Sequence, residues 1–172
     1  MSHHHYRHRN PLALLTPVMH RVLERMAPAF EHLLRNSVAH GIEDAEVREA
    51  LGKPAVGTIT IHVSQVSNDV SVAFSDDGSG LHLEKIRAKA TASGIIAPGA
   101  VLSEGDAANL IFAPGFSTAD HVTEVSGRGI GMDVVRSEVN ALGGRIETST
   151  THGQGTTFRL ILPLTTAVTQ VV

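Results

Sequence analysis

The chain has 172 residues, of which 42% are hydrophobic and 18% charged, and its formal net charge is −3. These values are ordinary for one globular domain, and no basic cluster outside the N-terminus suggests a nucleic-acid partner. The lack of cysteine excludes disulfides, thiol catalysis and zinc–thiolate sites, and no apolar run approaches the ~18 residues of a transmembrane helix. Because no secretory signal is present either, we expect a soluble, cytoplasmic domain with no direct membrane insertion.

The two ends of the chain differ in composition from the rest. MSHHHYRHRN suggests an expression tag or leader more strongly than a metal site, and we assign residues 1–18 to this leader. LPLTTAVTQVV ends on an apolar, β-prone run, which is typical of a chain cut at the entrance to another domain. We therefore expect one domain over residues 19–165 and the start of a following domain over residues 166–172.

The first half of the domain is predicted to form helices followed by two strands. Residues 19–40 have the apolar spacing of one long helix or of two, with Pro28 as a possible kink or restart. A short helix is expected over residues 44–51. Residues 57–65 and 68–76 alternate with a period of two and are separated by turn-prone residues, which predicts neighbouring antiparallel strands.

The second half is predicted to alternate between helices and strands around one long loop. The expected elements are helices over 83–93, 103–112 and 132–142, a loop over 113–131, and strands over 145–150 and 156–164. A loop of this length inside a compact domain is usually functional or disordered. Locally paired strands with helices between them favour a two-layer α/β sandwich with a mainly antiparallel mixed sheet.

A polar stripe runs along the first predicted helix. At 100° per residue, His32, Asn36 and His40 fall in a line beside an apolar arc. The residues of that arc are Phe30, Leu33, Leu34, Ser37 and Val38. Because solvent does not require histidines and an asparagine in register beside a core, we expect this stripe to face a binding site.

Three further stretches carry chemistry. SDDGSGL is as typical of a plain turn as of a site, but Asp76 follows an apolar strand, where its carboxylate would be partly buried and would need a donor. In SGRGIGMDVV, three glycines come directly before a predicted helix. Backbone N–H groups at such a helix start can bind an anion, although a flexible loop with a helix cap is the alternative. It matches neither the P-loop nor the Rossmann pattern. GQGTT alone would be a hairpin turn.

In this order, the four stretches resemble the GHKL family of ATP-binding domains, which includes histidine kinases, DNA gyrase, the Hsp90 chaperones and the MutL repair proteins. The resemblance covers nearly all of residues 20–165 and implies the GHKL α/β fold, with ATP and Mg²⁺ bound. A narrower similarity to the kinase domain of CheA-type chemotaxis histidine kinases rests on HLLRNSVAHGIE, DDGSGL, LIFAPGFSTAD, VSGRGIGMDVVR and GQGTTFRLILPLT.

The resemblance implies roles for residues that match the family's motifs. Asn36 would ligate Mg²⁺ through its amide oxygen, a donor suited to that ion. Asp76 would accept the hydrogen bond of the adenine amino group and so select ATP over GTP. His40 would approach the phosphates, and His32 occupies the position of a catalytic acid–base or metal-orienting residue. His32, Asn36 and His40 are therefore the expected catalytic residues.

The other implied contacts are with the base and the phosphates. Gly78 and Gly80 would let the chain pass close beside the base, and Thr156 or Thr157 would support the adenine pocket. Gly127, Gly129 and Gly131 would hold the β- and γ-phosphates, and residues 113–128 would form a lid that orders over bound ATP. The implied nucleotide-binding residues are Asn36, His40, Asp76, Gly78, Gly80, Lys85, Lys89, Ser126, Gly127, Arg128, Gly129, Ile130, Gly131, Thr156 and Thr157. Lys85 and Lys89 are the weaker candidates.

The implied function is transfer of the ATP γ-phosphoryl group to a histidine in two-component or chemotaxis-type signalling. The acceptor would lie on a separate, Hpt-like phosphoacceptor domain, and receptor or coupling proteins would be reached through other domains. Two alternatives remain. An ATP-hydrolysing GHKL protein commonly has Glu where this chain has His32, and a catalytically silent nucleotide-binding module would serve as an assembly surface.

Two features depart from the CheA pattern. Ala39 stands where Asp is common, at a position that the helical wheel turns away from the core, and alanine there resembles the CheA-like kinases of type IV pili. PLALLTPVM is a poor match to the strand that usually precedes the first long helix. We therefore expect one edge of the sheet to be missing or replaced.

Overall fold

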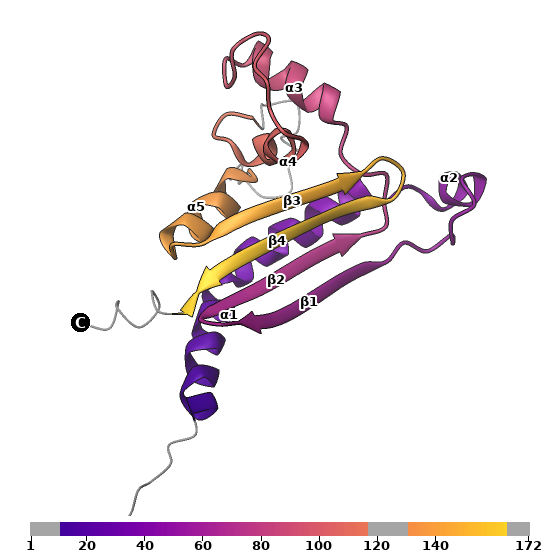
Figure 1. The fold of residues 1–172 in the computed structure, drawn as a ribbon. Helices are drawn as coiled ribbons and strands as arrows, with labels where there is room; N and C mark the ends of the chain where they lie inside the picture. Colours follow the sequence, from indigo (N-terminus) through magenta and orange to yellow (C-terminus); the bar gives the residue numbers. More distant parts are fainter. Residues whose placement is uncertain (1–10, 117–130, 165–172) are drawn as a thin grey trace, which may run out of the picture.

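The computed structural model describes residues 11–116 and 131–164 of the chain. One layer is a four-stranded sheet in the order β1-β2-β4-β3 (Figure 1). Its strands are β1 (Ile59–Val66), β2 (Asp69–Asp76), β3 (Arg145–Thr151) and β4 (Gly155–Pro163). The predicted two-layer α/β architecture is confirmed. The pairs within the described ranges are all antiparallel, so the mixed character expected of the sheet is not seen there.

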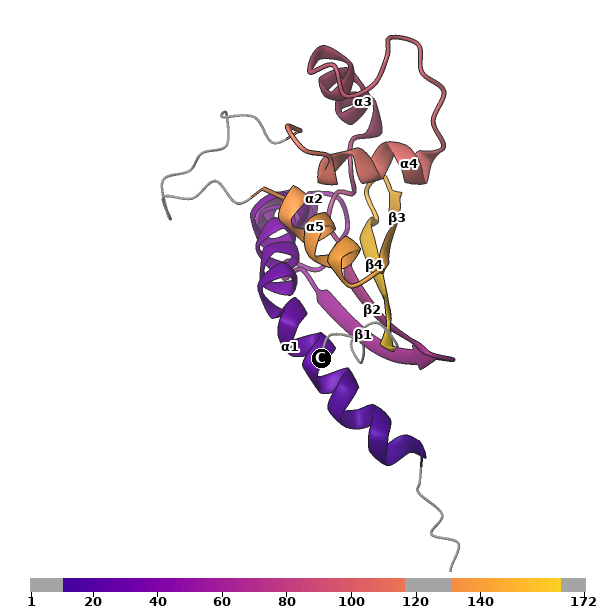
Figure 2. The same ribbon diagram turned by 90° about the vertical axis from the view of Figure 1, so that its left-hand side faces the viewer.

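The second layer consists of helices on one face of the sheet (Figure 2). α1 (Pro11–Asn36) and α5 (Asp133–Ala141) pack against that face, whereas α3 (Leu83–Ala92) and α4 (Glu104–Asn109) gather beside β3. α2 (Ala45–Ala50) extends away from the end of the sheet at which β2 finishes (Figure 1). Within the described ranges, no helix is both long enough and apolar enough to cross a membrane.

The core lies between the sheet and the two helices that cover it. Alternate positions of the central strands are buried, as a period of two requires. They are Val70, Val72 and Phe74 of β2 and Phe158, Leu160 and Leu162 of β4. Each such side chain contributes about 1.5–3 kcal/mol on burial. Asp76 follows two residues after Phe74, so the same alternation directs its carboxylate to the helix face of the sheet, at the last strand position.

Most predicted elements are found within a few residues of their expected bounds, and α1 differs most. It begins at Pro11 rather than at residue 19, and it continues through Pro28 without a restart. Proline at a first helical position is favourable, because its missing N–H group would have no partner there. The expected loss or replacement of a sheet edge before α1 concerns residues that lie partly outside the described ranges, and it stays a prediction. The predicted helix over 103–112 is α4 followed by a 3₁₀ turn, Leu110–Phe112.

The end of the first helix also differs from the prediction. α1 stops at Asn36 and a π-helical turn, Ser37–Gly41, follows, in which the Ile42 amide donates to the Ser37 carbonyl oxygen at 2.9 Å. Single π turns are rare and often occur at functional sites. The wider turn rotates the residues after Ser37, so the wheel prediction fails for Val38, which is 65% exposed rather than part of the core.

Candidate functional site

A hollow opens where α1 ends beside the last residues of β2 and the first residues of β4. The π turn, the loop after β2 and the two strands form its walls. Its lining includes Asn36, Ser37, His40, Asp76, Thr156 and Phe158. Asp76 and Thr156 are direct cross-strand partners, so strand register alone brings these two polar side chains together.

The Asp76 carboxylate is half-buried and held by two donors. The Ser37 hydroxyl donates to Oδ2 at 3.1 Å, and the Gly78 amide donates to Oδ1 at 3.0 Å. This confirms the prediction that the carboxylate is partly buried and hydrogen-bonded. An ionised carboxylate only accepts hydrogen bonds and has about four lone-pair sites, so two donors leave room for a ligand N–H group.

The chain around Asp76 is packed too closely for side chains at two glycines. A Cβ atom on Gly78 would overlap the Gly41 carbonyl oxygen, and one on Gly155 would overlap the Asp76 carbonyl oxygen. Gly155 also has a φ of 115°, which other residues rarely adopt. Close packing against the π turn therefore explains why position 78 is a glycine.

Gly80 approaches the β3–β4 hairpin instead. A Cβ atom there would lie 2.6 Å from the Thr151 carbonyl oxygen, and the φ of Gly80 is 77°. The Leu81 amide donates to the Thr150 hydroxyl at 2.8 Å, and the Gly153 amide donates to the Ser79 carbonyl oxygen at 2.7 Å. These contacts fix the loop after β2 to the hairpin, which forms the far wall of the hollow.

A group of four charged side chains lies behind the loop; we call it the Arg48 cluster, and it comprises Glu43, Arg48, Lys53 and Asp77. The Arg48 side chain is 0% exposed and donates to both carboxylates, at 3.0 Å to Glu43 and 2.9 Å to Asp77. Lys53 donates to the other oxygen of Glu43 at 2.6 Å. Buried charges need such partners, and here two cations face two anions.

Both carboxyl groups of the Arg48 cluster are more acidic than usual. Burial alone would raise the pKa of Glu43, but hydrogen bonds from Lys53 and the Glu43 amide, with the charges of Lys53 and Arg48, hold that pKa below its ordinary value. Burial would also raise the pKa of Asp77, but hydrogen bonds from the Thr58 amide and Arg48, with the charge of Arg48, hold it low. Both groups are therefore ionised at neutral pH.

The structure brings some of the predicted site residues into the hollow and leaves others outside it. Those in its lining are Asn36, His40, Asp76, Gly80 and Thr156. His32 lies one helical turn before Asn36, is half-buried and does not line the hollow. Gly131 precedes α5 and accepts from the Val134 amide at 3.2 Å. Residues 126–130 and most of the predicted lid lie outside the described residues.

The two predicted lysines also lie away from the hollow. Lys85 is exposed on α3, and the Lys89 ammonium lies 4.8 Å from the centre of the Phe116 ring, a cation–π contact. In this arrangement Lys89 holds α3 against the buried ring of Phe116.

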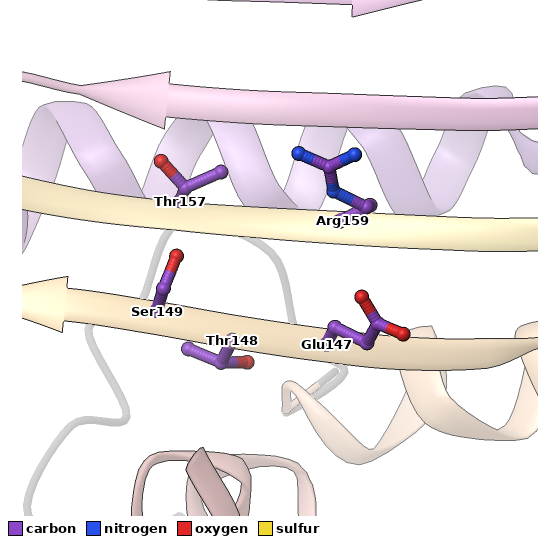
Figure 3. A pocket seen from close by; sticks show the side chains of 5 residues that line it. All are labelled: Glu147, Thr148, Ser149, Thr157 and Arg159. Carbon is purple, nitrogen blue, oxygen red and sulfur yellow. The ribbon is translucent and has the colours of Figure 1, made fainter. Parts of the chain in front are cut away.

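Thr157 differs from its neighbour Thr156, because adjacent strand residues point to opposite faces. It lies on the open face of the sheet, next to Ser149 and near the cross-strand pair Glu147 and Arg159 (Figure 3). Its hydroxyl is 2.8 Å from that of Ser75. Of the two threonines that the sequence left as alternatives, Thr156 is the one that lines the hollow.

Sequence reasoning missed several residues that shape the hollow. Ser37 was assigned to an apolar arc, although a hydroxyl among aliphatic side chains was a signal that a polar partner faces it. Gly155 lies in the GQGTT stretch but had no role of its own. Arg48 and Lys53 gave no signal, because charged side chains are exposed far more often than buried.

Comparison with known proteins gives matches over most of the chain. The family described as histidine kinase-, DNA gyrase B- and HSP90-like ATPase matches residues 24–166. The chemotaxis protein CheA of Rhizobium meliloti is 45% identical over 153 residues, which cover 89% of this chain and 20% of that protein. The gliding motility regulatory protein of Myxococcus xanthus is 46% identical over 145 residues, covering 83% of this chain and 19% of that protein.

The chain thus spans about a fifth of the length of these curated relatives. Among solved structures, the blue-light activated histidine kinase of Erythrobacter litoralis EL346 matches with a TM-score of 0.50 and 18% identity. That match covers 87% of this chain and 32% of the other. At this level of identity the likeness concerns the fold alone, and it agrees with the two-layer arrangement described above.

Proposed function

Because the chain belongs to the histidine kinase-, DNA gyrase B- and HSP90-like ATPase family, we propose that it is the ATP-binding catalytic domain of a CheA-type histidine kinase. It would transfer the γ-phosphoryl group of ATP to a histidine on a separate, Hpt-like phosphoacceptor domain. The observation that carries the proposal is the Asp76 carboxylate, which two donors hold at the wall of the hollow.

Asp76 would recognise the adenine ring. Its oxygens already accept from Ser37 and Gly78, and the remaining lone pairs suit the amino group at position 6 of the base. A keto oxygen at that position would face the carboxylate without a donor, which disfavours guanine. Thr156 and Gly80 line the same hollow and would support the base from β4 and from the loop after β2.

Asn36 would ligate Mg²⁺ at the end of α1. Its side chain lines the hollow, and an amide oxygen is a suitable ligand for this ion. In the described parts of the chain, no group of three acidic or histidine side chains forms a cage for a metal. This fits Mg²⁺, which is usually held by one or two protein groups together with the substrate phosphates and water. When bound, the ion would neutralise charge on the phosphates.

The residues of this chain would act by positioning. His40 lines the hollow on the π turn and would approach the phosphates, and residues 126–131 would hold the β- and γ-phosphates through backbone N–H groups. The acceptor imidazole is itself a nucleophile near neutral pH, so the domain needs no base that activates water. A nitrogen of that imidazole forms the new bond to phosphorus as the bond to the β-phosphate oxygen breaks and ADP leaves.

The pathway and the partners would be set outside this domain. The two relatives described above have nearly equal identity to the chain, and one is named for chemotaxis and the other for gliding motility. We propose that receptor or coupling proteins bind other domains of the full-length protein, and that it functions in the cytoplasm.

Calorimetry on the Asp76→Asn variant tests the assignment. We expect a loss of ATP affinity of about 1–3 kcal/mol, the usual cost of a mismatched buried hydrogen bond, and a smaller loss for inosine triphosphate, which has a keto oxygen at position 6. Asp106→Asn, which changes an exposed carboxylate on α4, is the control and should bind ATP as the unmodified chain does. Unchanged ATP affinity in a folded Asp76→Asn protein would remove Asp76 from the site.

A further inference from the structure

We propose that Arg48 and Lys53 are positioning residues for nucleotide selection, acting through the peptide group between Asp77 and Gly78. The inference rests on the proposed function, since it concerns how Asp76 is oriented to read the base. Neither cation lines the hollow, so both would act without touching the nucleotide.

The surroundings of Arg48 show that α2 does not serve the hydrophobic core. The apolar side chains of this region, Val47, Leu51 and Val56, are exposed, and α2 extends away from the helix layer (Figure 1). The fully buried side chain of α2 is instead Arg48. Burying a guanidinium group is costly unless its donors are paired, so its placement is the main structural feature of this segment.

Both cations converge on one carbonyl group. Arg48 Nη1 donates to the Asp77 carbonyl oxygen at 3.2 Å, and Lys53 Nζ donates to the same oxygen at 3.0 Å. Lys53 also donates to the Gly78 carbonyl oxygen at 2.9 Å. Both lone pairs of the Asp77 carbonyl oxygen can thus accept from charged donors, each of which also pairs with a carboxylate of the Arg48 cluster.

The other end of that peptide group faces the Asp76 carboxylate. The Asp77 carbonyl and the Gly78 amide belong to one trans peptide plane, so they point in opposite directions. Holding the carbonyl oxygen toward Lys53 therefore directs the Gly78 N–H group toward Asp76 Oδ1, at 3.0 Å. Positive charge at the oxygen also polarises the amide and strengthens its hydrogen bond.

The two cations would thereby fix which lone pairs of Asp76 stay open to a ligand. With the Gly78 amide firmly bound to Oδ1 and the Ser37 hydroxyl bound to Oδ2, the carboxylate has little freedom to rotate. A carboxylate that rotates freely would form a weaker hydrogen bond with the amino group of the base. We therefore expect removal of Lys53 to reduce the preference for a 6-amino purine, with less effect on binding in general.

The test compares ATP with inosine triphosphate by calorimetry in four proteins: the unmodified chain, Lys53→Met, Asp76→Asn and the double variant. We expect Lys53→Met to lower the ATP preference about tenfold, which corresponds to one hydrogen bond. In the Asp76→Asn background the same change should alter the preference by less than about twofold, because the two groups act in series. Lys53→Gln, which keeps a donor without the charge, should show a smaller loss and replaces Lys53→Met if methionine prevents folding.

Arg145→Met is the matched control, because it removes a cation from an exposed ion pair with Glu147, at the start of β3. It should leave the nucleotide preference unchanged. A wild-type preference in folded Lys53→Met, or an equal loss in both backgrounds, would overturn the inference.

A measurement without nucleotide separates this inference from the proposed function. The amide proton resonance of Gly78 should move upfield in Lys53→Met, because its hydrogen bond to Asp76 weakens, and should stay in place in Arg145→Met. If the unmodified chain shows no preference for ATP, the proposed function fails. In that case the Gly78 resonance alone decides whether Lys53 acts on this peptide group, and an unmoved resonance would contradict it.

Discussion

Gly78 is required by a neighbouring carbonyl group. Its Cβ position is occupied by the Gly41 carbonyl oxygen, which also accepts from the Ser79 amide at 2.8 Å. We predict that Gly78→Ala lowers the free energy of unfolding by about 1–3 kcal/mol or more, because the π turn must move away. Gly105→Ala in α4 is the control: its nearest contact would be an ordinary 3.6 Å, and alanine should stabilise the helix by up to ~1 kcal/mol.

Urea unfolding of the two variants beside the unmodified chain provides the measurement. The signs of the two changes are expected to be opposite. If Gly78→Ala were as stable as the unmodified chain, the close contact between the loop and the π turn would not exist in solution.

Individual residues differ in how well the sequence predicted them. The environment of Asp76 was predicted correctly, because a carboxylate after an apolar strand is placed by alternation alone. Val38 was predicted wrongly, because a helical wheel assumes 100° per residue and the π turn breaks that rule. The burial of Arg48 could not be predicted, since it depends on carboxylates and carbonyls from three separate segments.

At the scale of elements, the Arg48 cluster joins α2 to the end of β2 through ionised side chains. Both Glu43 and Asp77 have a lower pKa in the folded protein than their ordinary values of 4.5 and 3.8. The folded state therefore binds fewer protons than the unfolded chain in this range. The stability from these groups is fully present above about pH 5 and is lost as the pH falls through the folded-state pKa values.

We predict that the Glu43→Gln/Asp77→Asn double variant loses less of its free energy of unfolding between about pH 6 and pH 3 than the unmodified chain does. Urea unfolding at stepped pH values measures both curves. Glu49→Gln, which changes an exposed carboxylate on the same helix, should follow the unmodified chain. Parallel curves for the double variant would mean that these carboxyls do not contribute to acid sensitivity.

The elements themselves were easier to predict than their order in the sheet. All four described strands were predicted, two of them from a period of two, but such a pattern does not show which strand will be the neighbour. The pairing of β2 with β4, which joins residues far apart in sequence, was not evident. That pairing places Asp76 opposite Thr156, so part of the site arises from topology and not from any local motif.

At the scale of the whole molecule, the helix layer covers the sheet unevenly. It buries the inner faces of β2 and β4, but Ile61 and Val63 of β1, which point to the same face, remain 49% and 44% exposed. The opposite face carries polar side chains such as those of Ser149 and Arg159 (Figure 3). The two-layer architecture was predicted from the order of helices and strands, whereas the partial cover of β1 was not predicted.

The positions of the histidines indicate whether this chain could itself accept the phosphoryl group. An acceptor imidazole must approach in line with the γ-phosphate, from outside the nucleotide site. His20 lies on α1 roughly 24 Å from Asn36, at ~1.5 Å per residue, and His62 pairs with Ala73 on the open face of the sheet. His40 belongs to the wall of the hollow itself. None of these three is placed to attack bound ATP.

His32 is half-buried on α1, one turn before Asn36. The other two described histidines, His82 and His152, lie together with ring centres 5.6 Å apart. His82 precedes α3 and His152 lies in the turn between β3 and β4, and neither lines the hollow. We predict that this chain alone binds ATP yet forms no stable phosphohistidine, and that an added Hpt-like acceptor domain becomes labelled. Transfer of radiolabelled γ-phosphate, followed by acid and base treatment of each labelled band, measures this. Stoichiometric acid-labile label on the chain by itself would contradict the proposed separation of catalytic and acceptor domains. Release of free phosphate without labelled acceptor would favour an ATP-hydrolysing protein instead.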